Sequence, residues 1–149
     1  MKICTFFGHR DCPSTIQPRL QDVLEDLITN HDVNTFYVGH QGQFDSIVYH
    51  TLQELKKTYP HIHVTVVLAY MPGKKTEYND HSDTMLPEGI ESVHPHYAIS
   101  WRNNWMLKQS DYVVTYITRT YGGAAQYAGK AKSARKRIIE LGNERTEQL

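Results

Sequence analysis

The chain has 149 residues, 40% of them hydrophobic, and its 16 basic side chains balance 16 acidic ones to give zero formal net charge. This length fits a single domain with a sizeable core, and the composition excludes a disordered or fibrous chain. Zero net charge removes bulk electrostatics as a reason to expect a nucleic acid or an anionic membrane as partner, so affinity for phosphate has to come from a local site.

The first apolar run, residues 3–7, is too short for the hydrophobic region of a secretory leader, and no stretch reaches the roughly 18 apolar residues of a membrane helix. The only cysteines are Cys4 and Cys12, which form no CxxC pair and are too few for a secreted disulfide scaffold. We therefore expect a cytoplasmic protein. Cys4 is expected in the core, and Cys12 fits a buried side chain better than a reactive thiol.

Strands and helices alternate in the first half of the chain. A strand is expected over residues 3–7, where a β-prone run ends at Gly8. The next helix carries its apolar residues on one face: Leu20, Val23, Leu24, Leu27 and Ile28. A strand at 35–39, a similar helix over 44–57 and a strand within 62–70 complete a β-α-β-α-β order, which predicts a parallel sheet covered on both faces.

Regular patterns stop between residues 71 and 95, and we expect this long segment to be irregular. Helical spacing returns over 96–110, where Trp101 and Trp105 are expected on the core side and the polar residues 102–104 facing another way. A strand at 112–117, a helix opened by Gly122 and Gly123, and a strand at 137–141 follow. The sequence thus predicts one domain over 1–149, an α/β Rossmann-like three-layer sandwich with a mainly parallel sheet of about five strands. Its folded core spans 1–141, and 142–149 form a polar tail.

Three expected strands end in a glycine or threonine, then polar residues, then a helix start. The residues at these exits are Gly8, His9, Arg10; Gly39, Gln41, Gly42, Gln43, Asp45; and Thr118, Arg119, Gly122, Gly123. Ligands of open parallel sheets bind outside the carboxyl ends of the strands, where glycine allows close approach and helix N-termini attract anions. The three exits together predict an anion-binding crevice, although any one glycine alone is more typical of an ordinary turn.

Familiar catalytic and metal motifs are missing from the sequence. The histidines lack partners at metal-ligand spacing, so no metal is expected. The sequence has no Walker lysine loop, GxSxG elbow, HExxH motif or complete GxGxxG fingerprint. No cofactor is therefore indicated beyond a nucleotide-type ligand.

Three segments together resemble the SLOG superfamily, which includes YpsA-like proteins, DNA-processing DprA proteins and LOG phosphoribohydrolases. They are FFGHR at 6–10, WRNNWMLKQSD at 101–111 and YGGAAQ at 121–126. The likeness spans nearly the whole chain and is greatest to the small SLOG proteins of Gram-positive bacteria. It implies a Rossmann-like fold that binds a nucleotide or a nucleotide derivative, often as a sensor.

The resemblance also implies roles for individual residues. Gly8 and Arg10 match the glycine loop after the first strand, Arg102 and Asn103 match the polar pair ahead of the fourth strand, and Gly122 and Gly123 match the phosphate-contacting glycines. One departure concerns catalysis: LOG enzymes carry PGGxGTxxE, whereas Gly129 stands here at the position of the glutamate. Glycine cannot act as an acid or a base, so LOG-type cleavage is not expected at this position.

Three functions follow from these observations, and the first is preferred. In a nucleotide-binding sensor, close approach of the ligand to the backbone would be allowed by Gly8, Gly42, Gly122 and Gly123. Phosphate would be bound by Arg10 and Arg102. The sugar or the base would be contacted by Asn103, Gln43 and Asp45. Signalling would follow if segment 71–95 ordered over the ligand. A nucleotide hydrolase with relocated catalytic groups would use Asp45, Glu88 or His9.

The third function is DNA binding, and its support is a basic cluster that a solvated face explains equally well: Lys130, Lys132, Arg135, Lys136 and Arg137. Neither a nucleic acid nor a membrane is therefore the expected partner. The oligomeric state is left open, with the helix that carries the tryptophans as a candidate interface.

Overall fold

The computed structural model describes residues 2–70 and 83–142. Within them the chain forms one six-stranded sheet of order β4-β3-β2-β1-β5-β6, in which every neighbouring pair is parallel. The strands are β1 (Lys2–Gly8), β2 (Val33–Val38), β3 (His63–Val67), β4 (Asp83–Met85), β5 (Tyr112–Tyr116) and β6 (Arg137–Glu140). Parallel strands need crossovers, and helices supply most of them.

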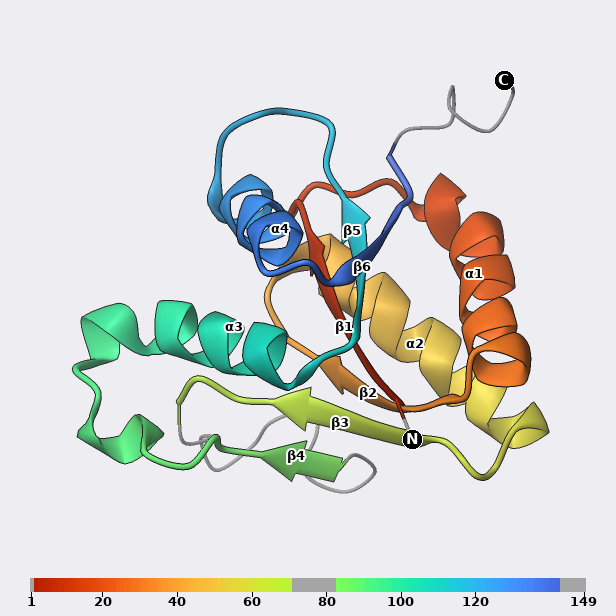
Figure 1. Cartoon of the computed structure of the whole chain (residues 1–149), viewed down its shortest axis with the longest axis horizontal. Helices are drawn as coiled ribbons and strands as arrows, with labels where there is room; N and C mark the ends of the chain where they lie inside the picture. The colour runs from red at the N-terminus through yellow and green to blue at the C-terminus, as the bar shows by residue number, and fades with distance from the viewer. Residues whose placement is uncertain (1, 71–82, 143–149) are drawn as a thin grey trace.

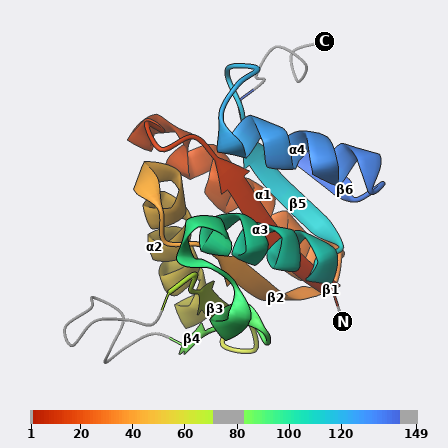
Figure 2. The same ribbon diagram turned by 90° about the vertical axis from the view of Figure 1, so that its left-hand side faces the viewer.

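Four helices cover the two faces of the sheet. They are α1 (Gln17–Asn30), α2 (Gly42–Thr58), α3 (Ala98–Gln109) and α4 (Gly123–Ser133). Helices α1 and α2 lie on one face, and α3 and α4 lie on the other (Figures 1 and 2). Short 3-10 helices occupy Ser14–Ile16, Ile90–Ser92 and Pro95–Tyr97. The structure therefore confirms the α/β, Rossmann-like three-layer sandwich.

The core is divided by the sheet into two parts. One is formed with α1 and α2 and contains Phe6, Leu24 and Phe36; the other is formed with α3 and α4 and contains Phe7 and Met106. Because β1 is central and buried on both faces, it is apolar at successive positions rather than at alternate ones. This explains why the run at 3–7 was such a clear strand signal.

The expected strand number was too low. β4 lies inside the segment 71–95 that was expected to be irregular, and residues 71–82 of that segment lie outside the described residues. β4 has only three residues, of which Asp83 and Thr84 are exposed, and it is held by pairing with β3. Such a short polar edge strand lacks the alternation that identifies strands in a sequence.

The side of α3 that faces the core also differs from the expectation. The buried residues of α3 include Ala98, Arg102 and Met106, which are spaced four apart, whereas Trp101 and Trp105 are half-buried. Trp105 packs against Tyr37, with ring centroids 5.3 Å apart. The inward stripe is therefore one residue further along the helix, and it includes a charged side chain.

The direction of the chain across the sheet creates a crevice beside β1. From β1 the chain crosses to β2 and β3 on one side, and it later returns to place β5 and β6 on the other side. The segment after β1 leads to α1, whereas the segment after β5 leads to α4 on the opposite face (Figure 2). Because these connections diverge, the space above the carboxyl ends of β1 and β5 is open to a ligand.

Candidate ligand-binding site

A cleft of about 330 Å³ lies at this switch point. Most of the predicted ligand residues line it: Gly8, His9, Arg10, Gln41, Asp45, Arg102, Asn103, Gly122 and Gly123. They come from the exits of β1, β2 and β5 and from α3. The parallel sheet thus brings together residues that lie more than one hundred positions apart in the sequence.

The remaining predicted residues lie directly behind this lining. The N–H of Gln43 donates to the carbonyl of Arg10 at 2.9 Å, and the N–H of Thr118 donates to Nε2 of His9 at 3.1 Å. Gly42 has a φ of +89°, and a Cβ there would lie 2.7 Å from Cγ of Arg10. These residues, with Gly39, hold the cleft side chains in place.

His9 is a buried connector between two strand exits. Only 3% of it is exposed, its backbone N–H donates to Tyr116, and Nε2 accepts from Thr118. Burial lowers the pKa of His9 below its usual value; the Arg119 charge lowers it further, and Asp11 acts in the opposite direction. Because Nε2 is an acceptor here, the neutral ring carries its proton on Nδ1.

Asp45 and Arg102 carry opposite charges, and both line the cleft close to Gly39. Arg102 is 2% exposed, and its guanidinium donates from Nη1 to the carbonyl of Val67 at 3.0 Å and from Nε to Oδ1 of Asn103 at 2.8 Å. Asp45 accepts the Gln41 N–H on Oδ2 at 2.9 Å. A Cβ on Gly39 would lie 2.8 Å from that oxygen and 3.2 Å from Nη1 of Arg102. Glycine at position 39 is therefore needed for the pair to approach the backbone.

The electrostatics of the pair make Asp45 an unusual carboxyl. Burial raises its pKa to about 6, against the stabilising effects of the Gln41 N–H and of the Arg102 and Arg10 charges. Burial also lowers the pKa of Arg102, which the nearby Asp45 partly offsets. An aspartate that titrates near pH 6 gives the cleft a charge that depends on pH in the physiological range.

Arginines dominate the charge of the cleft. Arg10, Arg102 and Arg119 all line it, whereas Asp45 is the carboxylate among the lining residues. Arg10 donates to the Gln41 side chain at 3.0 Å, and Arg119 bonds both oxygens of Asp11 through Nη1 at 3.1 Å. Nε of Arg119 is buried and has no hydrogen-bond partner among the described residues. The excess of positive side chains over negative ones in the cleft lining favours binding of an anion.

The N-terminus of α4 opens into the same cleft. Gly122 precedes the helix with φ +98° and ψ 169°, and no side chain caps the first turn. A Cβ at either Gly122 or Gly123 would meet no atom within 4 Å. The first turn of α4 therefore has no side-chain cap and open space at its two glycines, which suits phosphate binding at a helix N-terminus.

The apolar part of the cleft was not identified from the sequence. It is formed by Phe6, Phe7, Ile99, Met106 and Tyr127. Phe7 and Tyr127 stack with centroids 5.4 Å apart, and the Tyr127 hydroxyl lies 2.6 Å from that of Ser100. These residues also belong to or border the core, so their patterns indicated burial and gave no signal of a cleft. Arg119 was noticed at its strand exit but was not placed among the ligand residues.

The catalytic candidates are separated by the structure. Asp45 and His9 lie in the cleft, whereas Glu88 is exposed in the turn before Ile90–Ser92 and does not line the cleft. Cys12 is 3% exposed, and burial raises the pKa of its thiol to about 11, so it is protonated at neutral pH. No group of three potential metal ligands exists within residues 2–70 and 83–142, and no helix there is long and apolar enough to cross a membrane.

The sheet order, the crossovers and the cleft at the switch point define a Rossmann-like α/β protein. No protein-family model matches the sequence, and no curated protein matches it. Among solved structures, the chain is similar to DNA processing protein A (DprA) from Streptococcus pneumoniae, with a TM-score of 0.68 and 12% sequence identity. The match covers 94% of this chain and 50% of the DprA chain, so this chain spans about half the length of that protein. At this identity the likeness shows a shared fold, consistent with the expected relation to DprA-type proteins.

Proposed function

We propose that this protein binds a nucleotide or a nucleotide derivative in the cleft, with phosphate at the N-terminus of α4. The observation that carries the proposal is that three arginines line the same cleft as the uncapped N-terminus of α4, where two glycines stand. A guanidinium binds phosphate oxygens through paired N–H groups, and the helix supplies further donors. The cleft volume of about 330 Å³ lies within the range of small-molecule sites.

The other walls of the cleft suit the rest of such a ligand. Phe7, Met106 and Tyr127 line the cleft but are at most 5% exposed, so a planar base would rest on a small apolar surface. Asn103, Gln41 and Asp45 supply polar groups for a sugar or a base edge. A ligand that is anionic at one end and planar at the other matches this division, whereas a purely apolar ligand would leave buried charges unpaired.

Membership of the SLOG superfamily and a sensor role are part of this proposal. The residues that match the superfamily segments, Gly8, Arg10, Arg102, Asn103, Gly122 and Gly123, all line the cleft. Gly129, at the position of the LOG glutamate, lies on the exposed side of α4 and outside the cleft lining. Binding without LOG-type turnover is the role that these positions support best.

The binding proposal is tested by Gly123→Asp with Gly129→Asp as matched control. Both glycines are exposed on α4 with open space around their Cα atoms, so neither change creates a clash. Aspartate at 123 places a carboxylate where phosphate would sit, and it also favours the helix dipole. Calorimetric titration against a nucleotide panel should show binding to the wild type and to Gly129→Asp, and none to Gly123→Asp, whose melting temperature should be no lower than that of the wild type. Equal affinity of all three proteins would refute the site.

Hydrolysis is a second candidate because Asp45, with a pKa of about 6, lies in the cleft beside His9. Such a carboxyl can take or give a proton near neutral pH. Release of free base or ribose phosphate from the same panel, lost in Asp45→Asn, would support an enzyme. Binding of a nucleotide without any turnover would exclude the hydrolase and support the sensor function.

DNA binding is favoured only by the fold shared with DprA and by the basic residues of α4 and β6. It would appear as affinity for single-stranded or duplex DNA that falls steeply with salt. Loss of that affinity in a variant of Lys132 and Arg135, but not in Gly123→Asp, would move the function away from the cleft.

A further inference from the structure

β6 ends the sheet, and its outer edge is unpaired within the described structure (Figure 1). Arg137 donates its N–H to Asp111 at 3.2 Å, and Leu141 donates to Thr115 at 2.7 Å, both toward β5. Backbone groups of a strand alternate in direction, so those of Ile138 and Glu140 point away from β5, to the free edge. An exposed row of this kind is a template for another strand.

The side chains along one face of this edge have an ordered pattern of charge. Lys136, just before β6, and Ile138 and Glu140 within it alternate with residues of the other face. Ile138 is half-buried against Tyr127 and Ala131, which places this face on the side of α4. The Lys136 side chain makes a 3.5 Å contact with the Lys108 carbonyl, while its backbone N–H donates to the Ala131 carbonyl at 3.1 Å; Glu140 has no ion pair among the described residues. The edge therefore carries a positive charge at Lys136, two residues before Ile138, and a negative charge at Glu140, two residues after it.

We propose that β6 pairs antiparallel with β6 of a second copy of this chain, about a two-fold axis at Ile138. Residues directly opposite each other in an antiparallel pair must both point their backbone groups inward or both outward. A register centred on Ile138 meets this condition at Ile138, whose backbone groups point to the free edge. It sets Ile138 opposite itself with two exchanged hydrogen bonds, and Lys136 of each copy opposite Glu140 of the other. When two such edges run antiparallel, each positive charge lies opposite a negative one. This charge pattern fits a second copy of the chain better than an unrelated strand.

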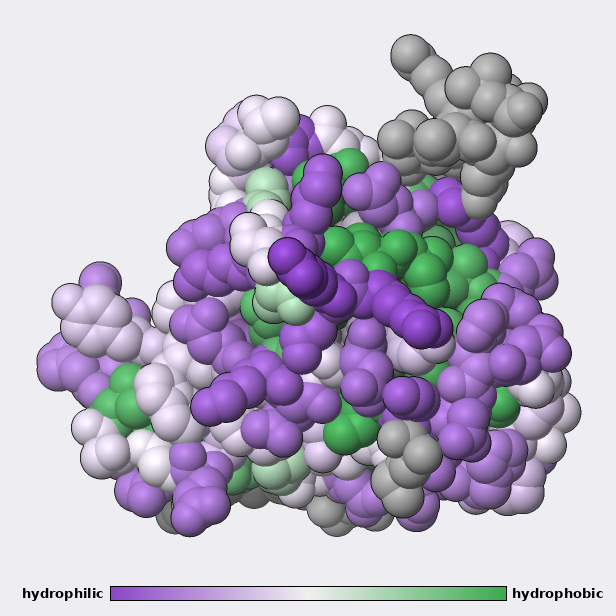
Figure 3. Space-filling view, in the orientation of Figure 1, coloured by the Kyte–Doolittle hydropathy of each residue, from purple (hydrophilic) through white to green (hydrophobic). Residues whose placement is uncertain are grey.

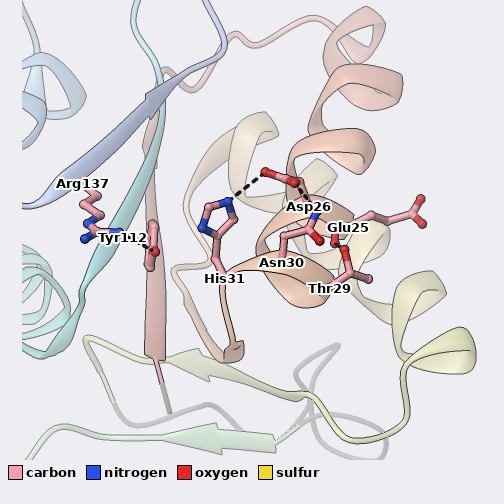
Figure 4. Close-up of polar contacts among 7 residues, drawn as sticks. All are labelled: Glu25, Asp26, Thr29, Asn30, His31, Tyr112 and Arg137. Carbon is pink, nitrogen blue, oxygen red and sulfur yellow. Dashed lines mark hydrogen bonds and ion pairs between the residues drawn. The ribbon is translucent and has the colours of Figure 1, made fainter.

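The opposite face of the edge is compatible with this pairing. Arg137 lies there and is already engaged, since Nη1 donates to the Tyr112 hydroxyl at 3.1 Å and the guanidinium lies over the Tyr112 ring (Figure 4). Ile139 and Val23 are half-buried against the core on this side. In the view of Figure 1, which looks onto β6, hydrophobic side chains are uncovered beside the strand and strongly hydrophilic ones flank them (Figure 3). A second copy would cover this patch.

The pairing defines the kind of dimer expected. β6 has four residues, so its strand contact is small and the dimer is a reversible one that dissociates on dilution. Antiparallel pairing leaves the two clefts at opposite ends of a continuous sheet. Ligand binding therefore does not depend on the dimer, and the two proposals can fail separately.

Charge reversal tests the register. Sedimentation velocity of the wild type over a dilution series should show a dimer at high concentration that gives way to the 17.3 kDa chain. Lys136→Glu sets glutamate opposite glutamate twice per dimer, and Glu140→Lys sets lysine opposite lysine. Each should raise the dissociation constant about tenfold. The double variant Lys136→Glu, Glu140→Lys restores opposite charges and should recover most of the affinity.

A backbone variant gives an independent measurement. The variant Ile138→Pro removes an N–H that points to the free edge and none that bonds β5, so it should abolish the dimer. Circular dichroism and nucleotide titration on the monomeric variants show that fold and cleft are intact. A wild type that stays monomeric up to its solubility limit overturns the proposal. So does a dimer whose affinity the two single charge reversals leave unchanged, or whose double variant is as weak as the singles.

Discussion

The backbone N–H of Thr118 donates to Nε2 of His9 at 3.1 Å, and this bond ties the exit of β5 to the exit of β1. The two residues lie 109 positions apart, yet they join the two loops that diverge to form the cleft. The Arg119–Asp11 ion pair, at 3.1 Å, connects the same loops one residue after Thr118 and two residues after His9. The opening of the cleft is therefore held by two neutral hydrogen bonds of His9, to Tyr116 and Thr118, and by one charged contact.

Two replacements of His9 test the hydrogen bond that it accepts from Thr118, because neither new side chain can take up a proton. His9→Gln keeps an acceptor for the Thr118 N–H, whereas His9→Leu leaves that N–H unpaired. The leucine variant should lose about 1–3 kcal/mol of the free energy of unfolding, and the glutamine variant less. Urea denaturation at pH 7.5 measures both. Equal loss in the two variants would show that the bond contributes nothing.

The lowered pKa of His9 also gives stability a pH dependence of known sign. As the pH falls below about 6.5, the unfolded chain takes up a proton at His9 before the folded chain does. The folded state therefore loses stability as the pH falls from about 6.5 toward the lower, folded-state pKa. The difference in free energy of unfolding between wild type and His9→Gln should shrink over this window, because glutamine does not titrate. A difference that is constant with pH would contradict the assignment.

Asp45 should make anion affinity depend on pH. Its pKa is about 6, so the carboxylate charge is present at pH 7.5 and largely gone at pH 5. Removing a like charge beside the anion site should tighten binding on the order of tenfold over this range. Sulfate is a suitable probe because its own charge does not change. Asp45→Asn should bind sulfate with little pH dependence and, at pH 7.5, more tightly than the wild type; parallel curves for the two proteins would exclude Asp45 as the titrating group.

The fold was predictable because local signals and the topology agree. The continuous apolar run of β1 and the one-sided apolar face of α1 are what a strand and a helix buried in this way require. β4 could not be seen, since Asp83 and Thr84 are exposed and the strand exists through its pairing with β3. Its formation depends on contacts that are remote in sequence, which periodicity does not register.

Residue patterns alone predicted the part of the cleft that depends on strand exits, whereas Arg102 and Asn103 of α3 were named only through the resemblance. Parallel strands place their exits on one edge, so the three polar loops had to converge. The burial of Arg102 was a different matter: it lies four residues from both Ala98 and Met106, on the stripe that packs inward. Assigning the core stripe to Trp101 and Trp105 left Arg102 on another face. The helical spacing of Arg102 with Ala98 and Met106 was the feature of the sequence that could have indicated its burial.

A double-mutant cycle measures how Arg102 and Asp45 depend on each other. Arg102→Met leaves the Val67 carbonyl without its 3.0 Å donor and removes the stronger of the two arginine charges that act on Asp45. The variant should lose about 3 kcal/mol of the free energy of unfolding at pH 7.5, as expected when one member of a buried pair is removed. Adding Asp45→Asn should restore part of that loss, because the neutral amide needs no counter-charge. Strict additivity in urea denaturation would mean that the two groups do not interact.

The two glycines that open α4 differ in what requires them. Gly122 has φ +98°, where residues with a side chain are strained, whereas Gly123 begins the helix and has no such conformation. Neither has an atom within 4 Å of its would-be Cβ, so packing does not explain either glycine. Gly122→Ala should therefore lose about 1–3 kcal/mol of the free energy of unfolding through backbone strain alone.

Gly123→Ala should behave in the opposite way. Alanine is the better helix former, so the free energy of unfolding should stay the same or rise by up to about 1 kcal/mol. Its methyl group would project into the cleft at the phosphate position and weaken nucleotide binding. Thermal unfolding and titration on the same samples separate these effects. A stabilised variant with undiminished affinity would mean that Gly123 serves no ligand, since neither backbone strain nor packing then accounts for the absence of a side chain.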